Sequence, residues 1–264
     1  MAETAHPTGS EPARRFAGTV CVVTGAARGI GLAIAERFAA EGGRLACFDV
    51  GAARLEAAVA GLVGRGIEAR AYAVDVGRRA AVIGGFEAVE RDFGATVGVL
   101  VNNAVWARFQ PLDEVDEASV DRMFDVGLKG LIWGIQAAAP QMKRRGSGAI
   151  VNFSSTSAVQ ALTNSTVYAA MKAGVLGLTR AAAVELSPHR IRVNSIIPGM
   201  VGTPASTAKF DPTTMAARLA AMPLGRFGDP AEIAAAVAFL ASDDSRYVQG
   251  AELVVDGGWT VATR

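Results

Sequence analysis

Residues 19–31 read TVCVVTGAARGIG and pass from a β-branched run through a glycine-rich turn into a helical pattern. The run from Thr19 to Thr24 ends at Gly25, as a buried parallel strand does. Glycines let the backbone turn tightly and approach a ligand, and the helix N-terminus behind them offers free amides to a diphosphate. Because the turn lies between an expected strand and an expected helix over 32–41, it indicates a dinucleotide-binding unit.

The next expected strand, Arg44–Asp49, ends in a carboxylate. In dinucleotide-binding units, an acidic residue about 20 residues after the glycine turn binds the hydroxyls of the adenosine ribose. Asp49 lies close to that distance from the turn. An aspartate that only begins a turn at a strand end is the alternative interpretation. Asp49 is therefore a candidate ribose ligand.

Strand and helix patterns alternate along the rest of the chain. This alternation predicts an α/β fold: one doubly wound parallel sheet, Rossmann-like, with helices on both faces and no second domain. Such sheets bind ligands at the carboxyl ends of their strands. The residues expected at those ends are Gly25, Asp49, Asp75, Asn102, Ser155 and Pro198. Further helices are expected over 52–65, 78–93, 117–144, 164–187 and 229–241, and further strands over 70–75, 97–101, 149–153, 191–197 and 252–255.

The segment Tyr168-Ala-Ala-Met-Lys172 carries the residues with the clearest chemistry. If it is helical, Tyr168 and Lys172 lie one turn apart on the same face. A nearby ammonium lowers the pKa of a phenol from roughly 10 and makes tyrosine a usable acid or base. Ser155, at the end of an expected strand, could then hold the substrate oxygen. An exposed helical tyrosine and lysine without a function are the alternative.

Composition favours one large globular domain. The chain has 264 residues, of which 51% are hydrophobic and 19% charged, so we expect a sizeable core. The net charge of +1 gives no electrostatic reason for binding nucleic acid or an anionic membrane, and we expect no membrane-spanning segment. The two isolated cysteines, Cys21 and Cys47, are expected to be reduced thiols in the core. Two such cysteines form neither a disulfide framework nor a metal site.

Two segments are expected to differ from the rest of the domain at 16–264. Residues 1–15 are polar and lack the apolar centre of a secretory signal, so we expect a disordered tail and a cytoplasmic protein. Residues 200–224 interrupt the strand–helix alternation with Gly202, Pro204, Pro212 and Pro223. We interpret this segment as a lid over the substrate, with an idle surface loop as the alternative.

Together these motifs resemble the short-chain dehydrogenase/reductase family over about residues 17–258. The family pattern Thr-Gly-x-x-x-Gly-x-Gly matches residues 24–31, and its Asp-Val matches Asp75-Val76. Its Asn-Asn-Ala-Gly matches residues 102–104 but ends in Val105. The family's catalytic Ser, Tyr and Lys correspond to Ser155, Tyr168 and Lys172. The remaining matches are residues 191–194, Pro198-Gly199, Thr203 for the cofactor carboxamide, and residues 255–258.

The resemblance implies a reversible hydride transfer between a nicotinamide cofactor and a secondary alcohol or ketone, a small-molecule substrate. Tyr168 would be the acid or base, Ser155 would hold the substrate oxygen, and Lys172 would lower the pKa of Tyr168 and bind the ribose. The family's usual assembly implies a homotetramer. The cofactor-binding residues that it implies are Gly25, Arg28, Gly29, Ile30, Gly31, Asp49, Asp75, Val76, Asn102, Ala104, Tyr168, Lys172, Pro198, Gly199, Val201 and Thr203.

The choice of cofactor depends on two residues with opposite charges. The carboxylate of Asp49 would accept hydrogen bonds from ribose hydroxyls and repel the 2′-phosphate of NADP. Arg28 argues for NADP, because a basic residue before Gly29 can bind that phosphate. We weigh Asp49 more heavily and expect NAD to be preferred.

Two departures from the family pattern raise an alternative. Gly127 stands where the family has an asparagine that supports a water linked to the active-site lysine, and Val105 narrows the space beside the cofactor. A catalytically impaired NAD(H)-binding regulator or scaffold is therefore the second hypothesis. A sugar-nucleotide epimerase or dehydratase fits poorly, because the chain has no room for an extra substrate domain. Glycine is a poor helix former, so Gly127→Asn is expected to be cheap and to raise turnover if the asparagine matters.

Overall fold

The computed structural model describes residues 14–160, 162–203 and 212–262. Its centre is one sheet of seven parallel strands in the order β3-β2-β1-β4-β5-β6-β7. The strands are β1 (Val20–Thr24), β2 (Arg44–Asp49), β3 (Ala69–Ala73), β4 (Val97–Asn102), β5 (Gly148–Phe153), β6 (Ile191–Pro198) and β7 (Glu252–Val255).

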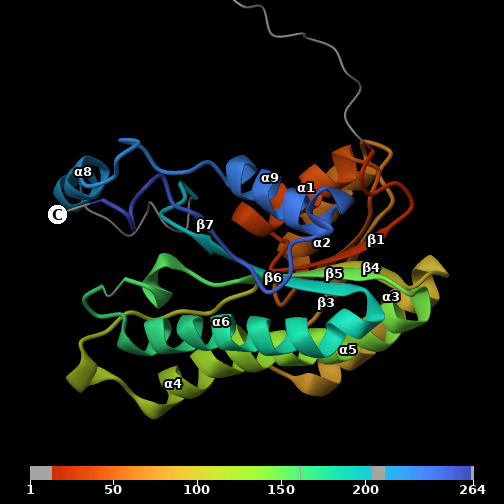
Figure 1. Cartoon of the computed structure of the whole chain (residues 1–264), viewed down its shortest axis with the longest axis horizontal. Coiled ribbons are helices and arrows are strands. Elements are labelled where there is room, and N and C mark those ends of the chain that lie inside the picture. Colours follow the sequence, from red (N-terminus) through yellow and green to blue (C-terminus); the bar gives the residue numbers. More distant parts are fainter. Residues whose placement is uncertain (1–13, 161, 204–211, 263–264) are drawn as a thin grey trace, which may run out of the picture.

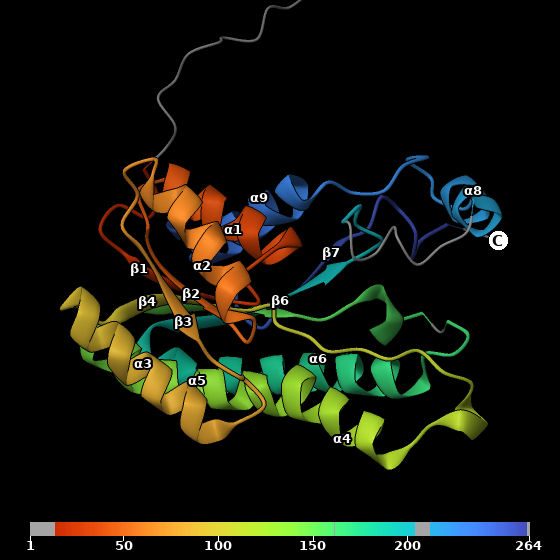
Figure 2. The ribbon, with the colours of Figure 1, turned by 180° about the vertical axis from the view of Figure 1, so that it is seen from behind.

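Helices cover both faces of this sheet, as Figures 1 and 2 show. One face carries α1 (Gly29–Ala40), α2 (Ala52–Val63) and α9 (Pro230–Ala241). The other carries α3 (Arg79–Phe93), α4 (Glu117–Phe124), α5 (Gly130–Arg145) and α6 (Thr166–Leu186). The predicted doubly wound α/β fold is confirmed.

The core lies in two layers because the side chains of the strands alternate between the two faces. Cys21 and Val23 of β1 face the layer under α1, whereas Val20 and Val22 face the layer over α3 and α5. Cys21 and Cys47 are buried and free, as expected. Burial raises the pKa of both thiols, that of Cys47 to about 12, so neither is a reactive thiolate at neutral pH.

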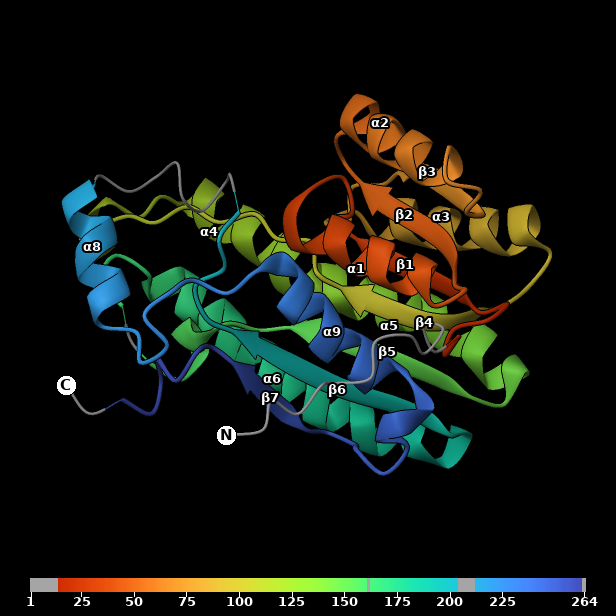
Figure 3. The ribbon, with the colours of Figure 1, turned by 90° about the horizontal axis from the view of Figure 1, so that it is seen from above.

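The parallel arrangement brings the carboxyl end of every strand to one edge of the sheet. In Figure 3 the strands point toward the side of the molecule on which α8 (Pro212–Ala220) lies. The chain runs outward from β1 to β3 and then returns to place β4 on the other side of β1. The crevice between the ends of β1 and β4 is therefore the switch point at which open α/β sheets bind ligands.

A long helix was expected near 117–144, and the chain is helical throughout 117–145, with one irregular turn. The structure divides the segment into α4 and α5, joined by a π-helical turn, Asp125–Lys129 (η2). Gly127 lies buried in this turn and faces Met171 of α6. A Cβ atom at Gly127 would lie 2.4 Å from the Met171 sulfur, so the methionine fills the space that a side chain at position 127 needs.

Helix α6 and the short turn after it, Thr166–His189, are long and apolar enough to cross a membrane by length and composition. By length and composition alone, this helix therefore does not meet the expectation that the chain has no membrane-spanning segment. In the fold α6 packs along the sheet, and Met171, Val175 and Thr179 on its inner side are each fully buried.

A chain of buried hydrogen bonds connects two strands to α6. The Asn102 amide nitrogen donates to the Asn152 side-chain oxygen at 2.9 Å, and the Asn152 amide nitrogen donates to the Thr179 hydroxyl at 3.0 Å. Thr179 in turn donates to the carbonyl oxygen of Val175 at 2.8 Å. Buried polar groups are costly unless they are paired, so this chain fixes α6 relative to β4 and β5.

We expect Asn152→Ala to lower the free energy of unfolding by about 2–4 kcal/mol, because it leaves polar groups of Asn102 and Thr179 without their partner. Thr179→Val keeps the shape of its side chain and should cost about 1–2 kcal/mol. Since the two residues form one chain, the double variant should cost less than the sum of the single variants. Urea unfolding of the three proteins measures this, and additive losses would contradict it.

We expect Gly127→Asn to lower the free energy of unfolding by about 1–3 kcal/mol, because the new side chain must displace the buried Met171. This reverses the expectation that the change is cheap. The matched control is Gly127→Asn combined with Met171→Ala, which vacates the space and should recover part of the loss. A single variant as stable as the parent protein in urea would refute the steric argument.

Candidate active site

A cleft of about 580 Å³ lies at the carboxyl ends of β1 to β4, at the switch point of the sheet. It brings together ten of the residues that were predicted to bind the cofactor: Gly25, Arg28, Gly29, Ile30, Gly31, Asp49, Asp75, Val76, Ala104 and Thr203.

The glycine turn is held by β4. The Thr24 hydroxyl accepts hydrogen bonds from the backbone nitrogens of Asn103 and Ala104, each at 3.0 Å, and donates to the Val101 carbonyl at 3.2 Å. The Asn103 amide nitrogen donates to the Thr24 carbonyl at 2.8 Å. These bonds close the floor of the cleft between the ends of β1 and β4.

The turn and the start of α1 fit a diphosphate. A Cβ atom at Gly31 would lie 2.1 Å from the Gly25 carbonyl oxygen, and Gly25 itself has a left-handed φ of 69°. The turn can therefore fold back onto the start of α1 only because these residues are glycines. No side chain caps the first turn of α1, and that turn carries no acidic residue, so its amides are available to an anion.

Asp49 lies in the cleft with two arginines. Its carboxylate accepts hydrogen bonds from the backbone nitrogens of Ala27 at 3.2 Å and Gly51 at 2.9 Å. These bonds orient Asp49 beside the glycine turn, so the turn-starting role and the ribose-ligand role are compatible. The exposed side chains of Arg28 and Arg54 line the same cleft.

Asp75 also lines the cleft, but its carboxylate already has partners. Arg122 of α4 approaches both carboxylate oxygens, at 3.2 and 3.3 Å, and the Gly77 backbone nitrogen donates to one of them at 3.0 Å. Asp75 therefore also connects the end of β3 to α4. Arg122 was missed, because nothing in the sequence relates it to Asp75.

Asn102 differs from the prediction in where its side chain lies. The side chain is engaged with Asn152 inside the sheet and does not line the cleft, whereas Asn103 does. The Asn-Asn pair in the sequence could have indicated either residue. The other lining residues that sequence reasoning did not assign to the cofactor are Val50, Gly51, Arg54, Val74, Val105, Trp106, Arg122 and Val126.

Ser155 and Tyr168 meet next along the same edge of the sheet. Ser155 follows β5, and its hydroxyl accepts a hydrogen bond from the Ser157 backbone nitrogen at 3.1 Å. Burial raises the pKa of Tyr168, and a hydrogen bond from Ser155 lowers it in part. Tyr168 is therefore a protonated phenol at neutral pH, and the serine that was predicted as its partner lies near enough to affect its pKa.

Lys172 lies one helical turn below Tyr168, and its side chain is only 2% exposed. Its ammonium donates to the Phe153 carbonyl at 2.6 Å and lies 5.9 Å from the centre of the Tyr168 ring. Burial lowers the pKa of Lys172 to about 7. The predicted effect of Lys172 on the pKa of Tyr168 is not among the causes that act here and stays a prediction.

Aromatic side chains border this group. The ring of Phe109 lies 5.2 Å from that of Tyr168, and Phe109 is 49% exposed. Trp106 and Val105, from the same segment after β4, line the cleft and are 38% and 47% exposed. Phe109 was missed, because a loop residue without periodicity gives no signal of its contact with a helix.

The segment after β6 is described in part. Pro198, Gly199 and Val201 lie beyond the cleft lining, and so do Ser155, Tyr168 and Lys172. Of the expected lid, residues 204–211 lie outside the described part of the chain. The described remainder includes α8, where a guanidinium nitrogen of Arg218 lies 3.6 Å from the sulfur of Met200.

Comparisons with known proteins agree over nearly the whole chain. A family profile described as enoyl-(acyl carrier protein) reductase matches residues 25–260. The chain is 40% identical over 247 residues to D-threitol dehydrogenase of Mycolicibacterium smegmatis, which is 94% of this chain and 95% of that enzyme.

Solved structures show the same likeness. NAD⁺-bound xylitol dehydrogenase matches with a TM-score of 0.88 at 36% identity, over 92% of this chain and 100% of that chain. A gluconate 5-dehydrogenase from Burkholderia cenocepacia in complex with NADP and tartrate matches with a TM-score of 0.90 at 32% identity, over 95% of this chain and 98% of that one. The chain therefore belongs to the short-chain dehydrogenase/reductase family, oxidoreductases that use a nicotinamide cofactor and act on alcohols and ketones.

Proposed function

We propose that the protein interconverts a secondary alcohol and a ketone with NAD(H) as the preferred cofactor, and that Tyr168 is its acid and base. The observation that carries the proposal is the placement of Ser155 beside the Tyr168 phenol, where it acts on the pKa of that phenol, next to a cleft that fits a dinucleotide. Lys172 lies buried directly behind this pair.

The hydroxyl groups of Tyr168 and Ser155 both act on the substrate oxygen, each in a different way. In the reducing direction Tyr168 donates its proton to that oxygen while Ser155 donates a hydrogen bond that stabilises the developing charge. A bound nicotinamide supplies or accepts the hydride. The raised pKa of Tyr168 keeps its phenol protonated at neutral pH, and the predicted effect of Lys172 would make that phenol a stronger acid. In the oxidising direction Tyr168 must first lose its proton, and the ammonium of Lys172 favours the phenolate that results.

The preference for NAD rests on the position of Asp49. Its carboxylate is held beside the glycine turn, where it can accept hydrogen bonds from two ribose hydroxyls and repel a 2′-phosphate. Arg28 and Arg54 oppose it, because their guanidinium groups line the same cleft. Asp49 prevails because its orientation is fixed by two backbone hydrogen bonds, whereas both arginines are exposed and flexible.

The remaining predicted roles extend this function. Pro198, Gly199, Val201 and Thr203 hold the nicotinamide side, and residues 200–224 act as a lid over the substrate. The predicted disordered tail over 1–15 is wrong at its last residue, because Arg15 forms ion pairs with Glu41 and Asp244, and residues 1–13 lie outside the described part of the chain. The enzyme is cytoplasmic and assembles as a homotetramer through its long helices. Exposed apolar side chains of α5, α6 and α9 support an assembly, among them Ile132, Val184 and Phe239.

A compact polyhydroxylated alcohol suits the site best. The ring of Phe109 packs against that of Tyr168, Trp106 lines the adjoining cleft, and Gln160 and Asn164 lie between Ser155 and Tyr168 in the sequence as polar contacts for a substrate. The names of the relatives support this class, since threitol, xylitol and gluconate each carry several hydroxyl groups.

The second candidate is an NAD(H)-binding regulator without turnover. The contact of Met171 with Gly127 favours it, because this contact removes the space of the family's asparagine. The presence of Ser155 beside Tyr168, with Lys172 buried one helical turn away, favours the enzyme. A regulator would bind NADH yet leave it unconsumed across a panel of ketones and oxidised sugars.

We expect Tyr168→Phe to abolish turnover on every substrate that the parent protein accepts, because only the proton donor is lost. NADH should still bind with an affinity within about threefold of the parent value, as fluorescence titration measures. Phe109→Leu is the matched control: it removes a ring that touches Tyr168 and should keep most of the turnover. Substantial activity in Tyr168→Phe would remove the acid–base assignment.

We expect the parent protein to bind NADH more tightly than NADPH and Asp49→Asn to reduce that ratio by about tenfold or more, since a charge mismatch costs about 1–3 kcal/mol. Arg28→Gln should change the ratio in the opposite direction. Titration of both cofactors against the three proteins measures this. Equal affinities of the parent protein for NADH and NADPH would refute the proposed preference.

A further inference from the structure

A second cleft, of about 520 Å³, lies at the opposite edge of the sheet. The amino ends of the central strands form its floor, with Thr19 before β1, Gly98 of β4, Gly148 of β5 and Ile191 of β6. The proposed reaction takes place at the carboxyl edge, so it gives this cleft no role.

Positive charge dominates the lining of this cleft. Its one carboxylate belongs to Asp243, and it has five arginines: Arg15, Arg145, Arg190, Arg192 and Arg246. The chain as a whole has a net charge of only +1. The concentration of arginines here is therefore a local feature of the cleft and does not follow from a basic protein.

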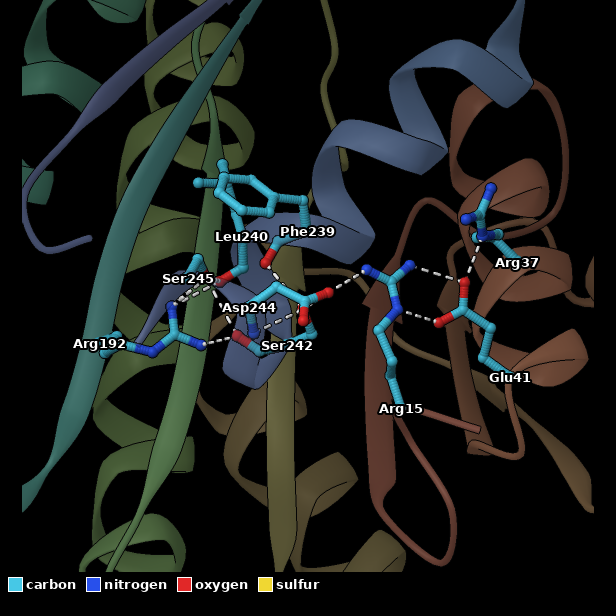
Figure 4. A network of polar contacts seen from close by, with 9 residues as sticks. All are labelled: Arg15, Arg37, Glu41, Arg192, Phe239, Leu240, Ser242, Asp244 and Ser245. Atoms are coloured by element: carbon cyan, nitrogen blue, oxygen red, sulfur yellow. Dashed lines mark hydrogen bonds and ion pairs between the residues drawn. The ribbon is translucent and has the colours of Figure 1, made fainter. Parts of the chain in front are cut away.

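Two of the five arginines have structural partners, as Figure 4 shows. Arg15 forms ion pairs with Glu41 at 2.6 Å and with Asp244 at 2.8 Å, so its charge is matched. Arg192 donates to the carbonyl oxygens of Leu240 and Ser242 at the end of α9, at 2.7 and 2.9 Å. These two side chains are rigid parts of the wall.

The other three arginines carry unmatched charge. Within the described ranges of the chain, the side chains of Arg145, Arg190 and Arg246 make neither an ion pair nor a hydrogen bond. All three are exposed. Three guanidinium groups thus border one concave space without a protein acceptor.

Arg145 and Arg190 are nevertheless fixed in position. A Cβ atom at Gly98 would lie 3.3 Å from two atoms of the Arg145 guanidinium group, so the missing side chain at Gly98 makes room for that group on the floor of the cleft. Arg190 has a left-handed φ of 57°, and its carbonyl accepts a hydrogen bond from the Gly148 backbone nitrogen. The backbone therefore holds Arg190 beside the start of β5.

Helix dipoles give a competing structural explanation. The C-termini of α5 and α9 end at this edge, and their partial negative charge favours nearby cations. That explanation accounts for Arg192, which bonds to the last carbonyls of α9. It also accounts in part for Arg145, which is the last residue of α5. Arg190 and Arg246 lie outside the α-helices, so it leaves them unexplained.

We propose that this cleft binds a compact polyanion of the pyrophosphate class, either free or as the phosphate end of a larger metabolite. Guanidinium groups bind phosphate oxygens through paired hydrogen bonds, and three of them around one cleft match two adjacent phosphates. Because the cleft lies at the amino edge of the sheet, such an anion binds without displacing the dinucleotide from the carboxyl edge.

The test is calorimetric titration of inorganic pyrophosphate into the full-length protein saturated with NADH, which keeps the glycine turn occupied. The variants are Arg145→Gln and Arg246→Gln. Arg144→Gln is the matched control, because it removes the same charge one residue away, where the side chain is paired with Glu90 at 2.6 Å. Two arginines are varied separately, so that the proposal can still be tested if one of the variants does not fold. Thermal unfolding without the anion checks that each variant is folded.

We expect saturable binding by the parent protein and by Arg144→Gln, and binding about tenfold or more weaker in Arg145→Gln and Arg246→Gln. The same titration with uridine diphosphate identifies the source: tighter binding than pyrophosphate supports a phosphate ester, and equal binding supports the free anion. The proposal would be overturned if pyrophosphate gave no saturable heat at concentrations up to about 10 mM, since weaker binding than that is not specific. Equal weakening by Arg144→Gln, unchanged affinity in both cleft variants, or release of NADH by pyrophosphate would also overturn it.

Discussion

The hydrogen-bonded chain from Asn102 through Asn152 to Thr179 is the constraint on which the site depends. It joins the strand that closes the dinucleotide cleft, the strand that delivers Ser155, and the helix that carries Tyr168 and Lys172. The groups are buried, so a shift of any one element would leave a polar atom unpaired at a cost of roughly 1–3 kcal/mol. Apolar packing alone would tolerate small translations of α6 along the sheet, whereas these hydrogen bonds do not.

The carboxyl edge of the sheet holds two different electrostatic environments, one at the dinucleotide cleft and one around Tyr168 and Lys172. At the dinucleotide cleft, charged side chains lie in contact with solvent and act through their sign, as Asp49 does against Arg28. Beside the end of β5, burial controls the charge instead: it raises the pKa of Tyr168 and lowers that of Lys172. Both shifts favour the neutral forms, which a buried pair adopts when no counter-charge is present. Tyr168 is thus neutral near pH 7, whereas Lys172, with a pKa of about 7, is divided between its charged and neutral forms.

The sequence was most informative where function depends on local spacing. The glycine turn, Asp49, and the Tyr168–Lys172 pair could be predicted because each follows from a strand end or a helical repeat. Arg122, Phe109 and Asn103 could not be assigned in the same way, because their contacts with Asp75, Tyr168 and Thr24 join segments that are distant in the chain. The π-helical turn between α4 and α5 could not be predicted either, since such a turn changes no hydrophobic period strongly enough to be seen.

Gly127 and Met171 occupy one shared volume between α6 and the π-helical turn. The order in which the two positions change therefore decides how an intermediate loses stability. A larger residue at 127 beside an unchanged methionine overpacks the site, whereas a small residue at 171 beside an unchanged glycine leaves a cavity that costs about 2–5 kcal/mol. The present pair is thus a local trap in sequence space, because either single step loses stability that the two changes together recover in part.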